Sequence, residues 1–255
     1  MKKYIEELHR LRVFRKKDVL LLTKDDNAAK ELLRRYKKIG LISQIRRNLY
    51  SANDLANKTT LATKFEIASQ ITPSAYLSYH AALEYHGLAN QVFYELYVSS
   101  EERFNNFEYE GISYTYCQSG ISPGVVNPPF DSMVKVTDLE RTVIDCIDDI
   151  NRSGGLEELV MCFSLITYIK EEQLLTYLDL YRKQFLFQKA GFILSFFQKE
   201  MKLSDDFFKE CRRKIGKSIR YLTETSNSGI YHKEWKLYAP ENILSYFLLN
   251  LLLPN

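Results

Sequence analysis

The segment from Ser78 to Gly87 holds two histidines and a glutamate, side chains that often bind metals or move protons. His80 and Glu84 are four residues apart, so they share one face of a helix, whereas His86 points elsewhere. The zinc motif HExxH needs its two histidines four residues apart, and here they are six apart. The segment therefore predicts no metal site, and a capped helix with satisfied polar groups explains it as well as a functional role does.

Glu140, Arg141 and Asp145 form a second group of ionisable residues, which would lie on one helix. Arg141 and Asp145 are four residues apart and can form an ion pair, worth about 0.3–0.5 kcal/mol on an exposed surface. This spacing favours a structural role. If Arg141 instead reached the helix of His80, it would join the two groups into one site.

An enzyme that acts on nucleic acid or nucleotides is one hypothesis for these side chains. Convergence in one pocket would favour it, although nothing in the local spacing requires convergence. The acid–base groups would be His80, Glu84, Glu140 and Asp145.

Positive charge is concentrated at the start of the chain. The net charge of the sequence is +3, but residues 1–57 hold 15 Lys and Arg against 7 Asp and Glu, whereas residues 58–255 hold 20 against 25. A basic segment attracts polyanions, because each neutralised phosphate releases condensed counterions. Nucleic acid is therefore the first partner to expect.

Hydrophobic periodicity predicts three helices in this basic segment. Turn and capping residues at 23–26 separate the last two, and Gly40 stands where a left-handed residue would end the third. The helices would span residues 4–11, 15–22 and 27–39.

A basic hairpin follows the third helix. Residues 41–42 and 49–50 can pair as strands around a tip at 43–48. Three small helices and a hairpin are typical of a winged helix-turn-helix, here over residues 1–54, whose last helix enters the major groove. A winged helix used for protein contacts is the alternative.

The outward stripe of the third helix and the hairpin tip would contact double-stranded DNA. Asn and Arg can hydrogen-bond adenine and guanine edges, whereas the other cations suit phosphates. The expected DNA-binding residues are Asn27, Lys30, Arg34, Lys37, Lys38, Arg46 and Arg47.

Residues 55–255 are expected to form a larger mixed domain. A helix capped by Asp54 would run to Pro73, and residues 92–98, 107–117 and 133–136 would form a small β-sheet. The fold class is therefore α+β, an N-terminal winged helix-turn-helix followed by a domain with a helical C-terminal half. The helices of that half would span residues 138–150, 156–168, 171–185, 189–200 and 204–215.

Several blocks of the sequence resemble the AbiEi-type antitoxins of bacterial abortive-infection systems, classed as type IV toxin–antitoxin pairs. Their order and spacing carry the resemblance, which covers roughly residues 14–197. Asn48 departs from it, since many relatives have Gly there. The blocks are KKIGLISQIRRNLY (37–50), YLSYHAALEYHGL (76–88), DLERTVIDC (138–146) and KAGFILSFF (189–197).

The resemblance implies a dual role. The N-terminal domain would bind inverted repeats in the promoter of its own operon and repress it, and the C-terminal domain would counteract a nucleotidyltransferase-like toxin without a stable complex. We therefore expect a repressor and antitoxin, not an enzyme, with no cofactor and no metal; an orphan regulator without a toxin is a further alternative. Candidates for antitoxin function are Ser78, His80, His86, Glu140, Arg141 and Asp145.

Other features of the sequence argue against a membrane protein, a secreted protein, a cysteine-based metal or redox site and a P-loop. The longest apolar stretch, Ile243–Leu253, is well short of the roughly 20 residues that span a bilayer, and the N-terminus lacks the apolar core of a secretory signal. We expect a cytoplasmic protein that binds no membrane. The four cysteines form no CxxC pair and are expected to stay reduced. Gly216-Lys217-Ser218 matches the end of a P-loop, but Cys211 stands at the position of its first glycine.

Overall fold

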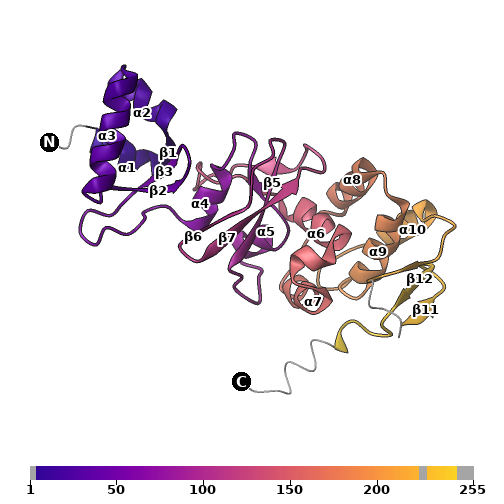
Figure 1. Cartoon of the computed structure of the whole chain (residues 1–255). Coiled ribbons are helices and arrows are strands. Elements are labelled where there is room, and N and C mark those ends of the chain that lie inside the picture. The colour runs from indigo at the N-terminus through magenta and orange to yellow at the C-terminus, as the bar shows by residue number, and fades with distance from the viewer. Residues whose placement is uncertain (1–3, 224–228, 246–255) are drawn as a thin grey trace.

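The computed structural model describes residues 4–223 and 229–245, which pack around three hydrophobic clusters. The first belongs to N-terminal helices and strands, the second to a six-stranded sheet with short helices, and the third to C-terminal helices. We refer to these as the N-terminal, sheet and helical units. They follow one another along the molecule in chain order, from indigo to yellow (Figure 1). The chain is α+β, as the sequence predicts.

The N-terminal unit combines helices with a small antiparallel sheet, in which β3 lies between β1 and β2. Leu32, Leu33 and Tyr36 bury one face of α3 in the first cluster and leave the opposite face to solvent. In chain order the elements are α1 (Ile5–Leu11), β1 (Val13–Arg15), α2 (Lys16–Thr23), α3 (Asp26–Lys38), β2 (Ile42–Arg46) and β3 (Leu49–Ala52).

Local signals set both ends of α3. The Asp25 carboxylate caps the helix by accepting a hydrogen bond of 2.6 Å from a backbone N–H of the first turn. At the other end Gly40 has φ +70°, and the N–H groups of Gly40 and Leu41 donate to the carbonyls of Lys37 and Tyr36. A residue without Cβ is favoured in this left-handed ending. The helix end predicted at Gly40 is confirmed.

The hairpin between β2 and β3 is tighter than predicted. Residues 43–46, expected at its tip, extend β2, and only Arg47 and Asn48 form the turn, with Asn48 at φ +62°. The cause is not local. Ile45 lies where the register with β3 shifts, and it is buried in the second cluster rather than exposed at a tip.

The N-terminal unit packs directly on the sheet unit. Strand β1 is too short for periodicity to predict, and its side chains alternate between two cores: Phe14 joins the first cluster and Val13 the second. Ile45 and Leu49 join Val13 there. One side of the small sheet therefore forms an apolar contact with the sheet unit.

The sheet unit is built on a mixed sheet of order β6-β7-β5-β4-β9-β8. Strands β5 and β7 are parallel, as are β4 and β9, and the other neighbours are antiparallel. The elements are α4 (Lys64–Ser69), β4 (Tyr76–Leu77), α5 (Tyr79–Tyr85), β5 (Glu95–Ser100), β6 (Phe107–Tyr109), β7 (Ile112–Gln118), β8 (Val125–Val126) and β9 (Val136–Thr137).

The helix predicted from Asp54 to Pro73 is shorter than expected. Asp54 accepts hydrogen bonds from backbone N–H groups of a turn and does not start a helix. Thr63 and Glu66 instead form a capping box, in which each side chain accepts a hydrogen bond from the other residue's N–H. This box starts α4 at Lys64.

The helical unit contains the predicted helices with shifted bounds and a small sheet of order β10-β12-β11. Arg182, at φ +54°, ends α8, so residues predicted at the end of the 171–185 helix begin α9 instead. The elements are α6 (Leu139–Asp148), a 3-10 turn (Ile150–Ser153), α7 (Leu156–Ser164), α8 (Glu171–Tyr181), α9 (Gln184–Ser195), α10 (Asp205–Lys214), β10 (Arg220–Tyr221), β11 (Ile230–His232) and β12 (Leu237–Ala239).

The structure describes all four cysteines but only part of the longest apolar stretch. Cys117, Cys146, Cys162 and Cys211 are all buried and unpaired. Among the described residues, no helix combines the length and apolar character needed to cross a membrane. Most of the apolar stretch 243–253 lies outside those residues.

Candidate functional site

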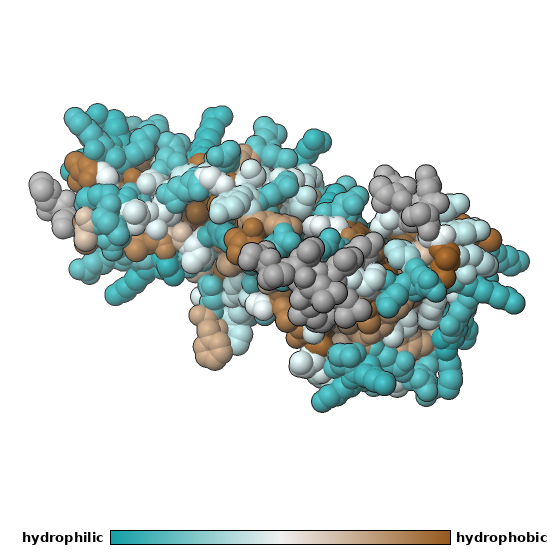
Figure 2. All heavy atoms as spheres, turned by 90° about the horizontal axis from the view of Figure 1, so that it is seen from below, coloured by the Kyte–Doolittle hydropathy of each residue, from teal (hydrophilic) through white to brown (hydrophobic). Residues whose placement is uncertain are grey.

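The outer face of α3 carries five of the residues predicted to bind DNA. The side chains of Lys30 and Arg34 are 61% and 72% exposed, and Asn27, Lys37 and Lys38 are also exposed. Hydrophilic side chains cover most of the N-terminal end of the molecule, at the left of Figure 2. The basic stripe is therefore accessible to a large partner.

Cations of this face pair with acidic neighbours. Asp26 accepts hydrogen bonds from Lys16 at 2.5 Å and Lys30 at 2.7 Å, and these bonds lower the pKa of its carboxyl. Arg34 donates from Nε and Nη2 to the two carboxylate oxygens of Glu31, at 3.0 and 2.9 Å. Because exposed ion pairs contribute little free energy, a phosphate or base edge can replace either carboxylate at small cost.

The two arginines at the hairpin turn differ in their surroundings. Arg47 is exposed. The Arg46 guanidinium lies 4.9 Å from the ring centroid of Phe107 and 5.8 Å from that of Phe104, and burial lowers its pKa. Arg46, predicted to bind phosphates, is thus held against the sheet unit, whereas Arg47 is free to meet a ligand.

A basic cleft of about 680 Å³ lies beside the hairpin. The DNA-binding prediction omits four cations that line it, although the run at 15–17 is visible in the sequence. This run lies near Arg103 because of the way the N-terminal and sheet units pack. The cationic lining is Arg15, Lys16, Lys17, Arg46, Arg47 and Arg103.

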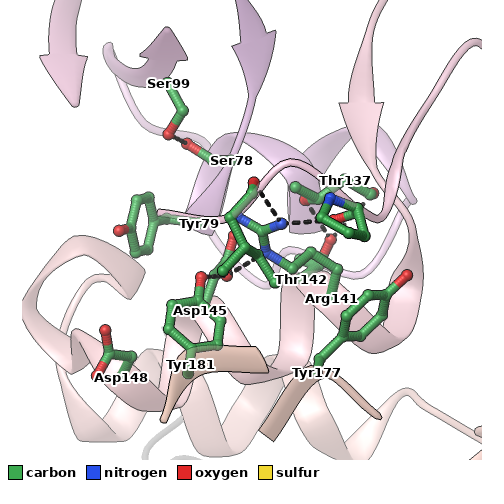
Figure 3. A network of polar contacts seen from close by, with 12 residues as sticks. Ser78, Tyr79, Ser99, Thr137, Arg141, Thr142, Asp145, Asp148, Tyr177 and Tyr181 are labelled. Atoms are coloured by element: carbon green, nitrogen blue, oxygen red, sulfur yellow. Dashed lines mark hydrogen bonds and ion pairs between the residues drawn. The ribbon is translucent and has the colours of Figure 1, made fainter. Parts of the chain in front are cut away.

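Arg141 and Asp145 form a buried pair rather than a surface one, since both side chains are at most 3% exposed. Arg141 Nε donates to Asp145 Oδ1 at 2.6 Å, and Nη1 donates to the carbonyls of Ile121 and Pro123 at 3.0 and 2.6 Å (Figure 3). Tyr181 also donates to Asp145. Burial raises the Asp145 pKa to about 6, against the opposing effects of Arg141 and Tyr181. The surface energy expected for this pair does not apply, because removing one partner would leave a buried charge.

Other antitoxin candidates bind neighbouring elements. Ser78 and Ser99 share a hydrogen bond of 2.8 Å, and His86 Nε2 lies 2.7 Å from the Thr137 carbonyl (Figure 3 shows both serines and Thr137). Glu140 accepts a hydrogen bond of 3.0 Å from the Lys170 N–H. These contacts join helices to strands and loops, which is a structural role.

His80 meets a glutamate that the sequence patterns do not single out. His80 Nε2 lies 3.1 Å from Glu158 Oε1, and the ring of Phe93 stacks on the imidazole at 3.9 Å. Glu158 also accepts hydrogen bonds from the N–H of Gln91 and the thiol of Cys162, at 3.0 and 3.3 Å. Because His80 and Glu158 are 78 residues apart, only the fold brings them together.

Among the described residues, His80, Glu158 and Cys162 form the group whose side chains are of the types that bind metals. The ligand atoms of His80, Glu158 and Cys162 lie within 4.8 Å of one another. In this structure the Cys162 thiol keeps its proton, which it donates to Glu158, and burial raises its pKa to about 12. Hydrogen bonds already occupy the Glu158 carboxylate. The group is better explained as a polar anchor for the loop at 90–91.

The residues of the enzyme hypothesis take separate partners in the described structure. His80 bonds Glu158, and Asp145 bonds Arg141. Glu84 pairs with the Lys64 ammonium at 2.5 Å, and Glu140 accepts from a backbone N–H. Arg141 binds its own helix and a nearby loop, so its described bonds do not join the two groups.

The comparisons establish similarity of fold. No family model and no curated protein matches the sequence. Among solved structures, the chain is similar to the crystal structure of the RV2827C protein from Mycobacterium tuberculosis, with a TM-score of 0.67 and 13% sequence identity over 98% of this chain and 94% of that chain. At this identity the likeness concerns the fold alone.

Proposed function

We propose that the chain is a DNA-binding transcriptional regulator that represses its own operon, and that residues 1–54 act as a winged helix-turn-helix. In this proposal α3 enters the major groove and the β2–β3 hairpin lies beside it as the wing. Arg34 and Asn27 would contact base edges, and the exposed lysines and Arg47 would contact phosphates.

One observation carries the proposal: the exposed basic face of α3 lies opposite a face that is anchored in the core. Leu32, Leu33 and Tyr36 are at most 6% exposed, whereas Lys30 and Arg34 are more than half exposed. A helix fixed along one side can present its other side to a groove at little entropic cost.

The test uses two arginines in matched surroundings. Arg34 and Arg213 are 72% and 69% exposed, and each pairs with a glutamate three residues earlier in its helix. Arg34→Ala should weaken binding to the promoter of the chain's own gene by about 1–3 kcal/mol and relax base preference, because a base contact is lost. Arg213→Ala should bind as the unaltered chain does. Fluorescence anisotropy with labelled duplexes measures both, and an Arg34→Ala chain with unchanged affinity and preference would reject the assignment of α3.

We also propose that residues 55–255 counteract a nucleotidyltransferase-like toxin. The support is the order of the sequence blocks at 76–88, 138–146 and 189–197, which resemble the AbiEi-type antitoxins. Ser78, His80, Arg141 and Asp145 of these blocks are at most 2% exposed. They would therefore support the shape of the domain rather than touch the toxin.

Co-expression with a nucleotidyltransferase-like gene adjacent to this one tests the second role. The Arg34→Ala chain should restore growth as the unaltered chain does, while a promoter reporter loses repression, since the two roles use different units. Loss of rescue by Arg34→Ala alone would contradict this separation. Absence of any such neighbouring gene would favour an orphan regulator.

A further inference from the structure

The basic cleft beside the hairpin holds more positive charge than its acidic lining can balance. Six Lys and Arg residues line it, and Asp26 is the carboxylate among its lining residues. Lys16 and Lys30 already bind that carboxylate. A net positive concavity of this kind attracts an anion, and low-dielectric walls strengthen the field.

The cations differ in how firmly they are held. Arg15 donates to the Gln70 carbonyl at 2.8 Å. Lys17, Arg47 and Arg103 are exposed, and the side chain of none of them has a hydrogen bond or ion pair to the described residues. These three side chains are therefore available to a ligand without breaking an existing contact.

Arg46 positions the two sides of the cleft. Its guanidinium rests on the rings of Phe104 and Phe107, and its Nη1 is buried without a hydrogen-bond partner in the described structure. Phe104 directly follows Arg103 in the chain, and Arg47 directly follows Arg46. The contact therefore holds the loop at 101–106 of the sheet unit next to the hairpin turn of the N-terminal unit.

The cleft shares a lysine with a hollow beside the proposed recognition face. A second hollow of about 210 Å³ is lined by Lys30, Arg34 and Lys37 of α3, and it shares Lys16 with the larger cleft. Positively charged side chains thus form a row that runs from the outer face of α3, past the start of α2, to Arg103. A row of positive side chains along an open surface fits the repeated phosphates of a nucleic-acid backbone.

We propose that Arg103, in the sheet unit, binds the phosphate backbone of the same DNA duplex that α3 contacts, with Lys17 of α2 beside it. The DNA interface then crosses the boundary between the first two units, and the loop at 101–106 extends the wing. This inference rests on the proposed DNA-binding function.

Salt dependence of DNA binding tests it in the full chain. Log affinity falls linearly with log salt, and each lost phosphate contact reduces the magnitude of this negative slope by about 1. Arg103→Ala should reduce the magnitude of the slope by about 1, and Lys17→Ala with Arg103→Ala by about 2. The loss should be equal for the promoter duplex and for a scrambled duplex of the same length, because phosphates carry no sequence.

The control is Arg213→Ala, which should keep the slope of the unaltered chain. Circular dichroism melts of the Arg103 and Lys17 variants should coincide with that of the unaltered chain, since both side chains are exposed and make no bond within the described residues. If Arg34→Ala weakens promoter binding while Arg103→Ala keeps the full slope, the inference is wrong and the DNA-binding proposal stands. If the unaltered chain binds neither duplex, both fail.

Discussion

At the scale of single residues, we expect the largest effects on stability from charged side chains that are buried and hydrogen-bonded. The Glu158 side chain is 3% exposed. Burial opposes its ionisation, but hydrogen bonds from His80, from the Gln91 N–H and from Cys162 hold the pKa of its carboxyl below the ordinary value of 4.5. The ionised carboxylate therefore stabilises the fold above pH 4.5, and this contribution is lost as the pH falls through the lowered pKa.

Replacing Glu158 by Gln should reveal this dependence. At pH 7 the variant should lose about 2–3 kcal/mol of unfolding free energy, because hydrogen bonds to a charged acceptor become hydrogen bonds to a neutral one. The difference from the unaltered chain should shrink at pH 3.5, because this pH lies below the ordinary carboxyl pKa of 4.5 and nearer to the lowered one, so part of the contribution of the charge is lost. Urea unfolding at the two pH values measures it, with the exposed Glu200→Gln as control. A penalty of equal size at both pH values would show that charge is not the cause.

At the scale of elements, the end of α3 depends on one backbone angle. A Cβ added at Gly40 would find ordinary contact with Lys58, at 3.5 Å, so φ +70° is the main obstacle to a side chain there. Gly40→Ala should cost about 1–2 kcal/mol of unfolding free energy, and Gly40→Asn less, since Asn tolerates left-handed angles better. Thermal and urea unfolding provide the measurement. An alanine variant as stable as the unaltered chain would mean that the α3 ending does not need this conformation.

Sequence predicted elements whose signals are local. The bounds of α3 follow from Asp25 and Gly40, and the Thr63–Glu66 capping box that starts α4 is also a short-range pattern, although the prediction placed the cap at Asp54. The length of β2 was missed because Ile45 packs against a different unit.

The candidate site was predictable to different degrees. The exposure of Lys30 and Arg34 follows from helix periodicity, since they lie opposite the apolar stripe of α3. The burial of Arg141 could not be predicted, because carbonyls about twenty residues away and Tyr181 of α8 complete its surroundings. Arg103 lies far from the N-terminal unit in sequence, and only packing places it near Arg47.

At the scale of the whole molecule, the first two units share a core. Val13, Ile45 and Leu49 belong to the same cluster as Ile67 and Ile71 of the sheet unit. Units joined by an apolar contact keep a fixed relative position better than units joined by a linker alone. Deleting residues 1–54 would expose part of that cluster, so single substitutions on α3 separate the proposed functions more cleanly than truncation.

The four buried cysteines can report how often the regions that bury them open to solvent. Burial raises the thiol pKa of Cys117 to about 11 and that of Cys211 to about 12, so the reactive thiolate is scarce at neutral pH. Cys117 lies in the sheet unit, and Cys146, Cys162 and Cys211 lie in the helical unit. An alkylating reagent would thus modify each cysteine at a rate set by local opening of the region around it. It would not modify the N-terminal unit, which has no cysteine.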